Sequence, residues 1–134
     1  MNIILPGDKD YESRPSVQRK SLRINLNENI YGTFVEIGAG QEVARNFYRV
    51  GAASGTIAKS MSAYDKSFSD SIYGKEENGR YVTQNRLDKM LDHEMDLLEK
   101  RISRDKNPDK FFFVYANTVA TIDFVKKFKG HGWM

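Results

Sequence analysis

Residues 32–50 read GTFVEIGAGQEVARNFYRV, and this stretch decides the fold. Residues 32–37 are rich in β-branched and aromatic side chains, which favour a buried strand. A glycine-rich turn over 38–40 follows, and residues 41–50 then place apolar side chains at helical spacing. A strand, a glycine turn and a helix in this order are typical of doubly wound α/β proteins.

The flanking residues predict further helices. Ser16 is suited to cap a helix that ends near several asparagines, and the residues expected on its partly buried side are Val17, Leu22, Ile24 and Leu26. The longest helix is expected over 83–103, where apolar side chains recur at helical spacing after the cap residue Thr83. A short helix or an ordered loop is expected over 65–73.

Two further strands complete the pattern. Residues 56–64 alternate loosely, and residues 111–119 form a nearly continuous apolar run, typical of a strand covered on both faces. We predict an α/β domain over 16–134, with a mixed or parallel sheet of about three or more strands flanked by helices. Residues 1–15 are expected to be an exposed lead-in. Residues 130–132 are expected to form a flexible turn, and Trp133 after it is expected to begin another strand. The chain is therefore expected to be the N-terminal part of a longer protein.

Composition limits the possible chemistry. The chain has 134 residues and no cysteine, which excludes disulfides, thiolate nucleophiles and cysteine-based metal sites. Its two histidines are isolated, so we expect no metal site. Because no signal peptide and no membrane-length apolar run is present, we expect a cytoplasmic protein without a membrane partner.

The net charge of +3 is modest. Basic residues form two small clusters, which we interpret as solvated surface, and nucleic acid is therefore not an expected partner. The clustered residues are Arg19, Lys20 and Arg23, and then Lys126, Lys127 and Lys129.

The most specific feature is VEIGAGQE over 35–42. Such a turn before a helix N-terminus binds phosphates or nucleosides in doubly wound folds. The stretch resembles the first motif of class I S-adenosylmethionine methyltransferases, although Glu42 stands where that motif has a third glycine. This predicts a site for a small anionic, nucleotide-like or S-adenosylmethionine-like ligand, formed by Glu36, Gly38, Gly40 and Gln41. In the alternative that we favour, the glycines only permit a tight turn.

Polar residues at strand ends add to this hypothesis. Asn117 and Thr118 are expected at the carboxyl end of the 111–119 strand, where they would share one rim with Glu36 if the two strands are parallel. The alternative is that they hydrogen-bond a turn. Glu36 itself is expected to reach solvent, and the alternative is a buried carboxylate paired with Arg45 or Lys59.

Three functions follow from these features. The first is ligand binding at the glycine turn, and the third is nucleic-acid processing. The second is a non-catalytic oligomerisation or assembly module, because Met90 and Leu97 lie outside the main apolar stripe of the 83–103 helix and could face a partner. The sequence identifies no catalytic residue and no cofactor.

Residues 29–45, NIYGTFVEIGAGQEVAR, 115–121, YANTVAT, and 130–133, GHGW, resemble an uncharacterised family of longer bacterial cytoplasmic proteins. Some members are labelled TonB-dependent receptor or nicotinate-nucleotide adenylyltransferase. The residues support neither label, because the barrel strands of the former and the early histidine motif of the latter are missing. The resemblance implies a bacterial protein longer than this chain and brings no established activity.

Overall fold

The computed structural model describes residues 15–122, 125 and 129–134, and it has an α/β fold built on a four-stranded sheet. The strands are β1 (Ile30–Gly38), β2 (Ile57–Met61), β3 (Phe111–Ala120) and β4 (His131–Trp133), in the order β2-β1-β3-β4. β1 is parallel to β2 and β3, whereas β4 is antiparallel to β3. The predicted mixed sheet is therefore confirmed.

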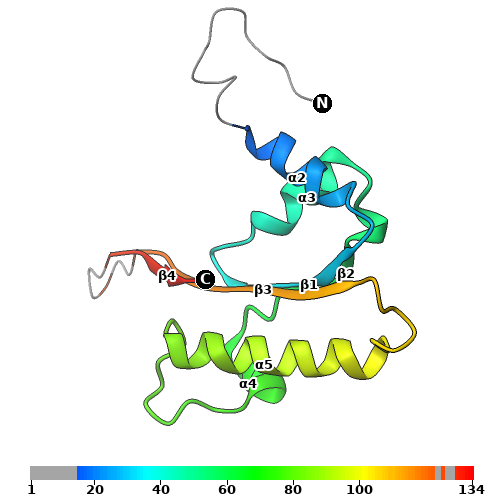
Figure 1. The fold of residues 1–134 in the computed structure, drawn as a ribbon. Helices are drawn as coiled ribbons and strands as arrows, with labels where there is room; N and C mark the ends of the chain where they lie inside the picture. Colours follow the sequence, from blue (N-terminus) through cyan, green and yellow to red (C-terminus); the bar gives the residue numbers. More distant parts are fainter. Residues whose placement is uncertain (1–14, 123–124, 126–128) are drawn as a thin grey trace, which may run out of the picture.

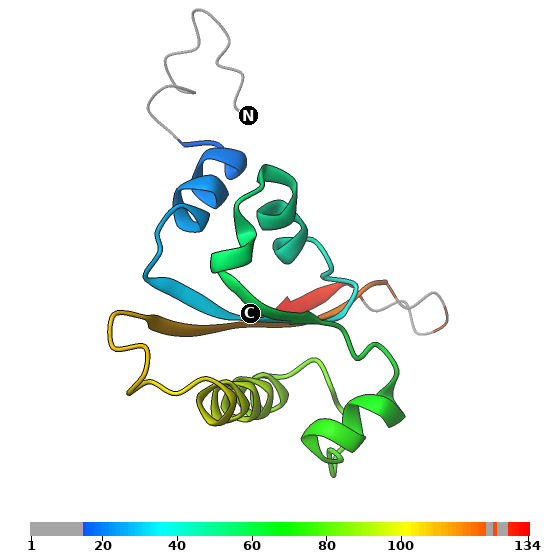
Figure 2. The same ribbon diagram turned by 90° about the vertical axis from the view of Figure 1, so that its right-hand side faces the viewer.

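Helices cover both faces of the sheet. They are α2 (Val17–Asn25), α3 (Val43–Val50), α4 (Lys66–Tyr73) and α5 (Gln84–Arg101). Figures 1 and 2 show α2 and α3 on one face and α4 and α5 on the other. Because α3 connects β1 to β2 while α4 and α5 lead to β3 on the other side of β1, the chain is doubly wound.

Local capping signals set the helix starts. The side chains of Ser16, Asp65 and Thr83 each accept a hydrogen bond from a backbone N–H three residues later, at 3.2, 3.0 and 3.1 Å. The cap at Asp65 decides between the two interpretations of 65–73 in favour of a helix.

Each sheet face has its own core. On the face of α4 and α5, the packed side chains are Val35, Ile37, Ala63, Tyr73, Leu87, Met90 and Ala116. On the face of α2 and α3, the Phe34 ring lies 5.0 Å from Phe47 and 5.4 Å from Phe113, measured between centroids. Because both faces of β1 are covered, its residues from Gly32 to Ile37 are all buried.

The packing of α2 differs from the prediction. Its buried residues are the polar Ser21 and Asn25. Of the residues expected on its partly buried side, Leu22 and Ile24 are half-buried, whereas Val17 and Leu26 are 53% and 64% exposed. Asn25 determines this orientation, because its Nδ2 donates to the carbonyls of Phe47 at 2.9 Å and Gly51 at 2.8 Å at the end of α3. Asn25 therefore satisfies carbonyl groups at the C-terminal end of α3, and an apolar side of α2 faces outward as a result.

The C-terminal residues extend the sheet. The strand expected near Trp133 is present as β4, and His131, expected in a flexible turn, pairs with Ala120. Most of the predicted lead-in and two residues of the second lysine cluster, Lys126 and Lys127, lie outside the described residues. Within the described part of the chain, none of the helices is long and apolar enough to cross a membrane.

Candidate functional site

The structure brings the predicted strand ends together. β1 and β3 are parallel neighbours, and Glu36 pairs with Asn117 in their register. Their carboxyl ends therefore share one rim of the sheet, and the turn over 38–42 leads from this rim into α3. This is the edge where doubly wound proteins bind their ligands.

Glu36 is buried at this rim, with 4% of its surface exposed, so the expectation that it reaches solvent was wrong. Its Oε1 accepts from the backbone N–H of Val43 at 2.9 Å and from Asn117 Nδ2 at 3.1 Å, and its Oε2 accepts from Ala44 N–H at 3.2 Å. These donors, together with the positive end of the α3 dipole, compensate for the lost hydration of the carboxylate. Neither Arg45 nor Lys59 pairs with it among the described ion pairs.

The rest of the turn is closed by its own hydrogen bonds. Gln41 Nε2 donates to the carbonyls of Glu36 at 2.7 Å and Gly38 at 2.9 Å. Asn117 Nδ2 also donates to the carbonyl of Gly40 at 2.8 Å. The turn is thereby fastened to the end of β3.

Both glycines are required by close packing. Gly38 has a φ of +80°, and a Cβ there would lie 2.1 Å from the carbonyl oxygen of Val119. A Cβ on Gly40 would lie 2.6 Å from Cγ2 of Val119. The favoured interpretation gave the glycines a purely structural reason, a tight turn, and the structure adds a second one, the close approach of the turn to β3.

Thr118 does not join the other candidate residues. Adjacent strand residues point to opposite faces, so Thr118 faces α5 while Asn117 faces α3. Thr118 Oγ1 donates to the carbonyl of Tyr81 at 2.9 Å, which fastens β3 to the segment before α5. The hydrogen bond to the glycine turn that the alternative describes is made by Asn117, through the carbonyl of Gly40.

These contacts limit the chemistry of the rim. The N–H groups of Val43 and Ala44, which would receive an anion at the α3 N-terminus, already bind Glu36. A groove of about 280 Å³ lies beside the turn, with Gln41, Arg45 and Tyr48 among the residues that line it. The ligand site predicted at the turn stays a prediction, and its anion-binding form is disfavoured by the charge of Glu36.

A cluster of buried charged side chains, which was not predicted from the sequence, lies between α4 and α5. Arg86 is 1% exposed, its Nη2 donates to Ser69 Oγ at 2.7 Å, and its Nη1 donates to the Gly74 carbonyl. Its guanidinium carbon lies 5.5 and 4.8 Å from the ring centroids of Tyr73 and Tyr81. These contacts join the start of α5 to α4 and to the loop that follows it.

Glu94 forms a second buried contact on α5. Its Oε1 accepts from the Tyr73 hydroxyl at 2.8 Å, and its Oε2 lies 2.5 Å from Lys59 Nζ. Every fourth residue of this part of α5 is buried: Arg86, Met90 and Glu94. The prediction that Met90 faces a partner was therefore wrong. One feature of the sequence could have revealed the cluster: Arg86 and Glu94 lie four residues before and after Met90, on the same side of the helix.

Burial and hydrogen bonding raise the pKa values of two tyrosines in this region. Burial, reinforced by the hydrogen bond to Glu94, raises the pKa of Tyr73 far above its usual value. The hydrogen bond to Asp70 raises the pKa of Tyr81. The folded state therefore keeps the Tyr73 hydroxyl protonated at alkaline pH.

Among the described residues, no group of three or more His, Cys, Asp or Glu side chains is arranged to hold a metal ion. No family model, no curated protein and no solved structure matches the chain. The suspected bacterial family therefore stays a prediction.

Gly38→Ala tests the packing of the turn on β3. We expect it to lower the free energy of unfolding by about 3 kcal/mol or more, because backbone strain adds to the overlap with Val119. Gly79→Ala is the matched control, since Gly79 has a φ of +68° but open space around its Cβ, and we expect a loss of about 1 kcal/mol. Urea denaturation measures both values, and equal losses would contradict the packing argument.

Tyr73→Phe tests the buried hydroxyl. A raised pKa in the folded state gives stability that is present below the pKa of the unfolded tyrosine, about 10, and is lost as the pH rises above it. The variant lacks this loss but is less stable at neutral pH, because Glu94 loses a donor. We expect the stability difference between the two proteins to be constant up to about pH 9 and to narrow as the pH rises above about 10, and a difference that stays constant above that pH in denaturant titrations would refute the assignment.

Proposed function

We propose that this domain is a non-catalytic interaction module that binds an acidic amphipathic helix on the outward side of α2. The observation that carries the proposal is the polarity of α2, which buries Ser21 and Asn25 while Leu22 is only half-buried and the C-cap residue Leu26 is exposed. A helix normally buries its apolar side, so an exposed Leu26 next to a half-buried Leu22, on a helix whose buried residues are polar, supports a second contact surface.

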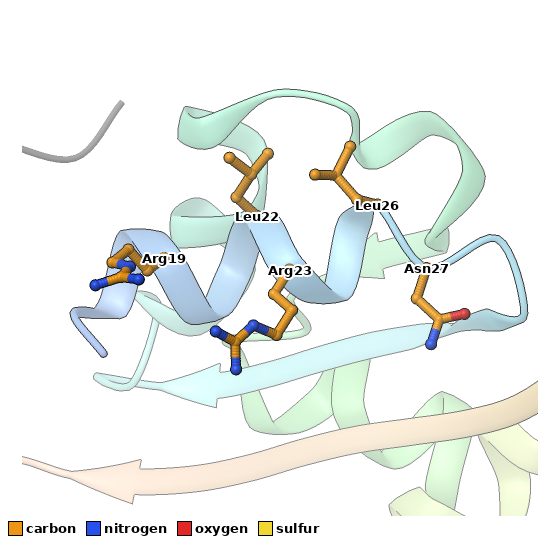
Figure 3. A pocket seen from close by; sticks show the side chains of 5 residues that line it. All are labelled: Arg19, Leu22, Arg23, Leu26 and Asn27. Carbon is orange, nitrogen blue, oxygen red and sulfur yellow. The ribbon is translucent and has the colours of Figure 1, made fainter. Parts of the chain in front are cut away.

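The outward side of α2 has a defined shape. Leu22 and Leu26 leave the helix in the same direction, whereas the Arg23 side chain extends to the other side of the helix in this view and Arg19 lies near its N-terminal end (Figure 3). Together with Asn27 these residues line an open groove of about 430 Å³. A groove lined by both leucine and arginine side chains suits a helix with apolar and acidic residues.

Charge supports an acidic partner. All ion pairs among the described residues lie between residues 59 and 104, so the cations of α2 and α3 have no carboxylate partner in the structure described here. These cations are Arg19, Lys20, Arg23, Arg45 and Arg49. Carboxylates of a bound helix would complement them and accelerate association.

Two other occupants fit less well. A second copy of the chain would place like charges of two α2 helices against each other. A membrane surface would gain little, because membrane binding scales with apolar area and α2 has only 9 residues. Oligomerisation through the 83–103 helix stays a prediction, and the buried Met90 no longer supports it.

A designed peptide tests the proposal. The probe is a labelled helix of about 15 residues with leucines at i, i+3 and i+7 and flanking glutamates. We expect fluorescence anisotropy to show binding, which Arg23→Glu weakens about fivefold or more and Leu26→Asn about tenfold. Both side chains are exposed, so the variants should fold.

The control variant is Arg80→Glu, which makes the same charge change at an exposed residue between α4 and α5 and should leave the affinity unchanged. A second control is the same peptide with lysines in place of glutamates, which should not bind. Equal affinity for both peptides would overturn the proposal, as would binding only to phosphatidylserine vesicles, which would assign α2 to a membrane surface instead.

A further inference from the structure

A second pocket lies on the opposite side of the sheet from α2, between α5 and the edge strand β2. Its volume is about 250 Å³, and its apolar walls include Leu97, Leu98 and Ile102. Lys59, Glu94 and Arg101 are polar residues of the same pocket. Apolar walls with a few converging polar groups are the usual composition of a small-molecule site.

An irregularity in β2 aims Lys59 at this pocket. Gly32 pairs with Ile57 and Thr33 pairs with Lys59, so β2 has one extra residue, Ala58, opposite β1. In a regular strand Ile57 and Lys59 would project from the same face, whereas this bulge places them on opposite faces. Lys59 consequently shares the face of Thr33 and reaches α5.

The lysine is held in place by a buried carboxylate. Glu94 has a side-chain exposure of 1%, and its two oxygens bind Lys59 and the Tyr73 hydroxyl. The side chain of Lys59 is 35% exposed, and an ammonium group has three N–H donors. Glu94 can therefore fix the ammonium while leaving a donor for another acceptor.

Arg101 adds a second cation. It extends from the last turn of α5 and has no ion pair among the described residues. With Lys59 and Arg101 positive and Glu94 negative, the pocket has one net positive charge. Its charge therefore favours an anion, and its walls favour an apolar body.

We propose that this pocket binds a small amphipathic organic acid, whose carboxylate contacts Arg101 and Lys59 and whose apolar body packs on Leu97, Leu98 and Ile102. The site lies in a different layer from the α2 groove and does not depend on the proposed function. Glu94 acts in it as a positioning residue for Lys59.

The test uses octanoate below its micellar concentration as the probe, with 1-octanol and octylammonium as uncharged and cationic counterparts. Two-dimensional amide NMR locates binding, and calorimetry measures it. We expect octanoate to shift the amide signals of Leu97, Leu98 and Ile102 and to bind more tightly than either counterpart. Arg101→Gln should weaken octanoate binding about tenfold.

Two matched variants separate this site from general electrostatics. Arg104→Gln removes the same charge at a residue that pairs with Glu99 outside the pocket, and Arg23→Glu changes the α2 groove. Neither should alter octanoate binding. Equal binding of octylammonium, an unchanged affinity in Arg101→Gln, or shifts confined to other residues would overturn the proposal.

Discussion

Burying the carboxylate of Glu36 requires donors on both of its oxygens, and separate parts of the chain supply them. The first N–H groups of α3 come from the residues just after the turn, and the amide of Asn117 comes from β3. Because a buried, unpaired carboxylate is costly, these elements must be placed together. The two glycines of the turn follow from the same constraint, since they let the turn approach Val119 closely.

This constraint also explains why the rim of the sheet differs from an anion site of similar sequence. In an anion-binding turn the free N–H groups of the helix face the ligand. Here a side chain of the protein itself occupies them, so a motif that resembles a ligand site serves to join β1, α3 and β3. The two binding sites proposed above lie elsewhere, on α2 and beside β2.

Much of the fold could be predicted from the sequence because local signals agreed with it. The caps at Ser16 and Thr83, the glycine turn and the apolar run of β3 each have one simple interpretation. The orientation of α2 could not be predicted, because it depends on Asn25 finding the carbonyl groups of α3, which only the tertiary structure brings near. Leucine spacing alone favoured the opposite side.

The candidate site, like the fold, could be predicted only in part. That Glu36 and Asn117 would share one rim was predicted on the condition that their two strands are parallel, which the structure fulfils. Whether the carboxylate would be solvated or buried depended on the start of α3, whose N–H groups no sequence pattern assigned to it. The buried Arg86 and Glu94 were missed because charged residues on a long helix are usually solvated, and their burial depends on partners in α4 and β2.

The contact between Glu36 and Asn117 joins residues that are 81 positions apart in the chain. Its loop-closure entropy must be overcome before the contact can form, which slows pairings of this kind relative to local ones. The hydrogen bonds from Val43 and Ala44 to Glu36, by contrast, involve only residues 36–44. We expect the first half of the chain to assemble around a carboxylate that is still partly hydrated, with the arrival of β3 completing its burial late in folding.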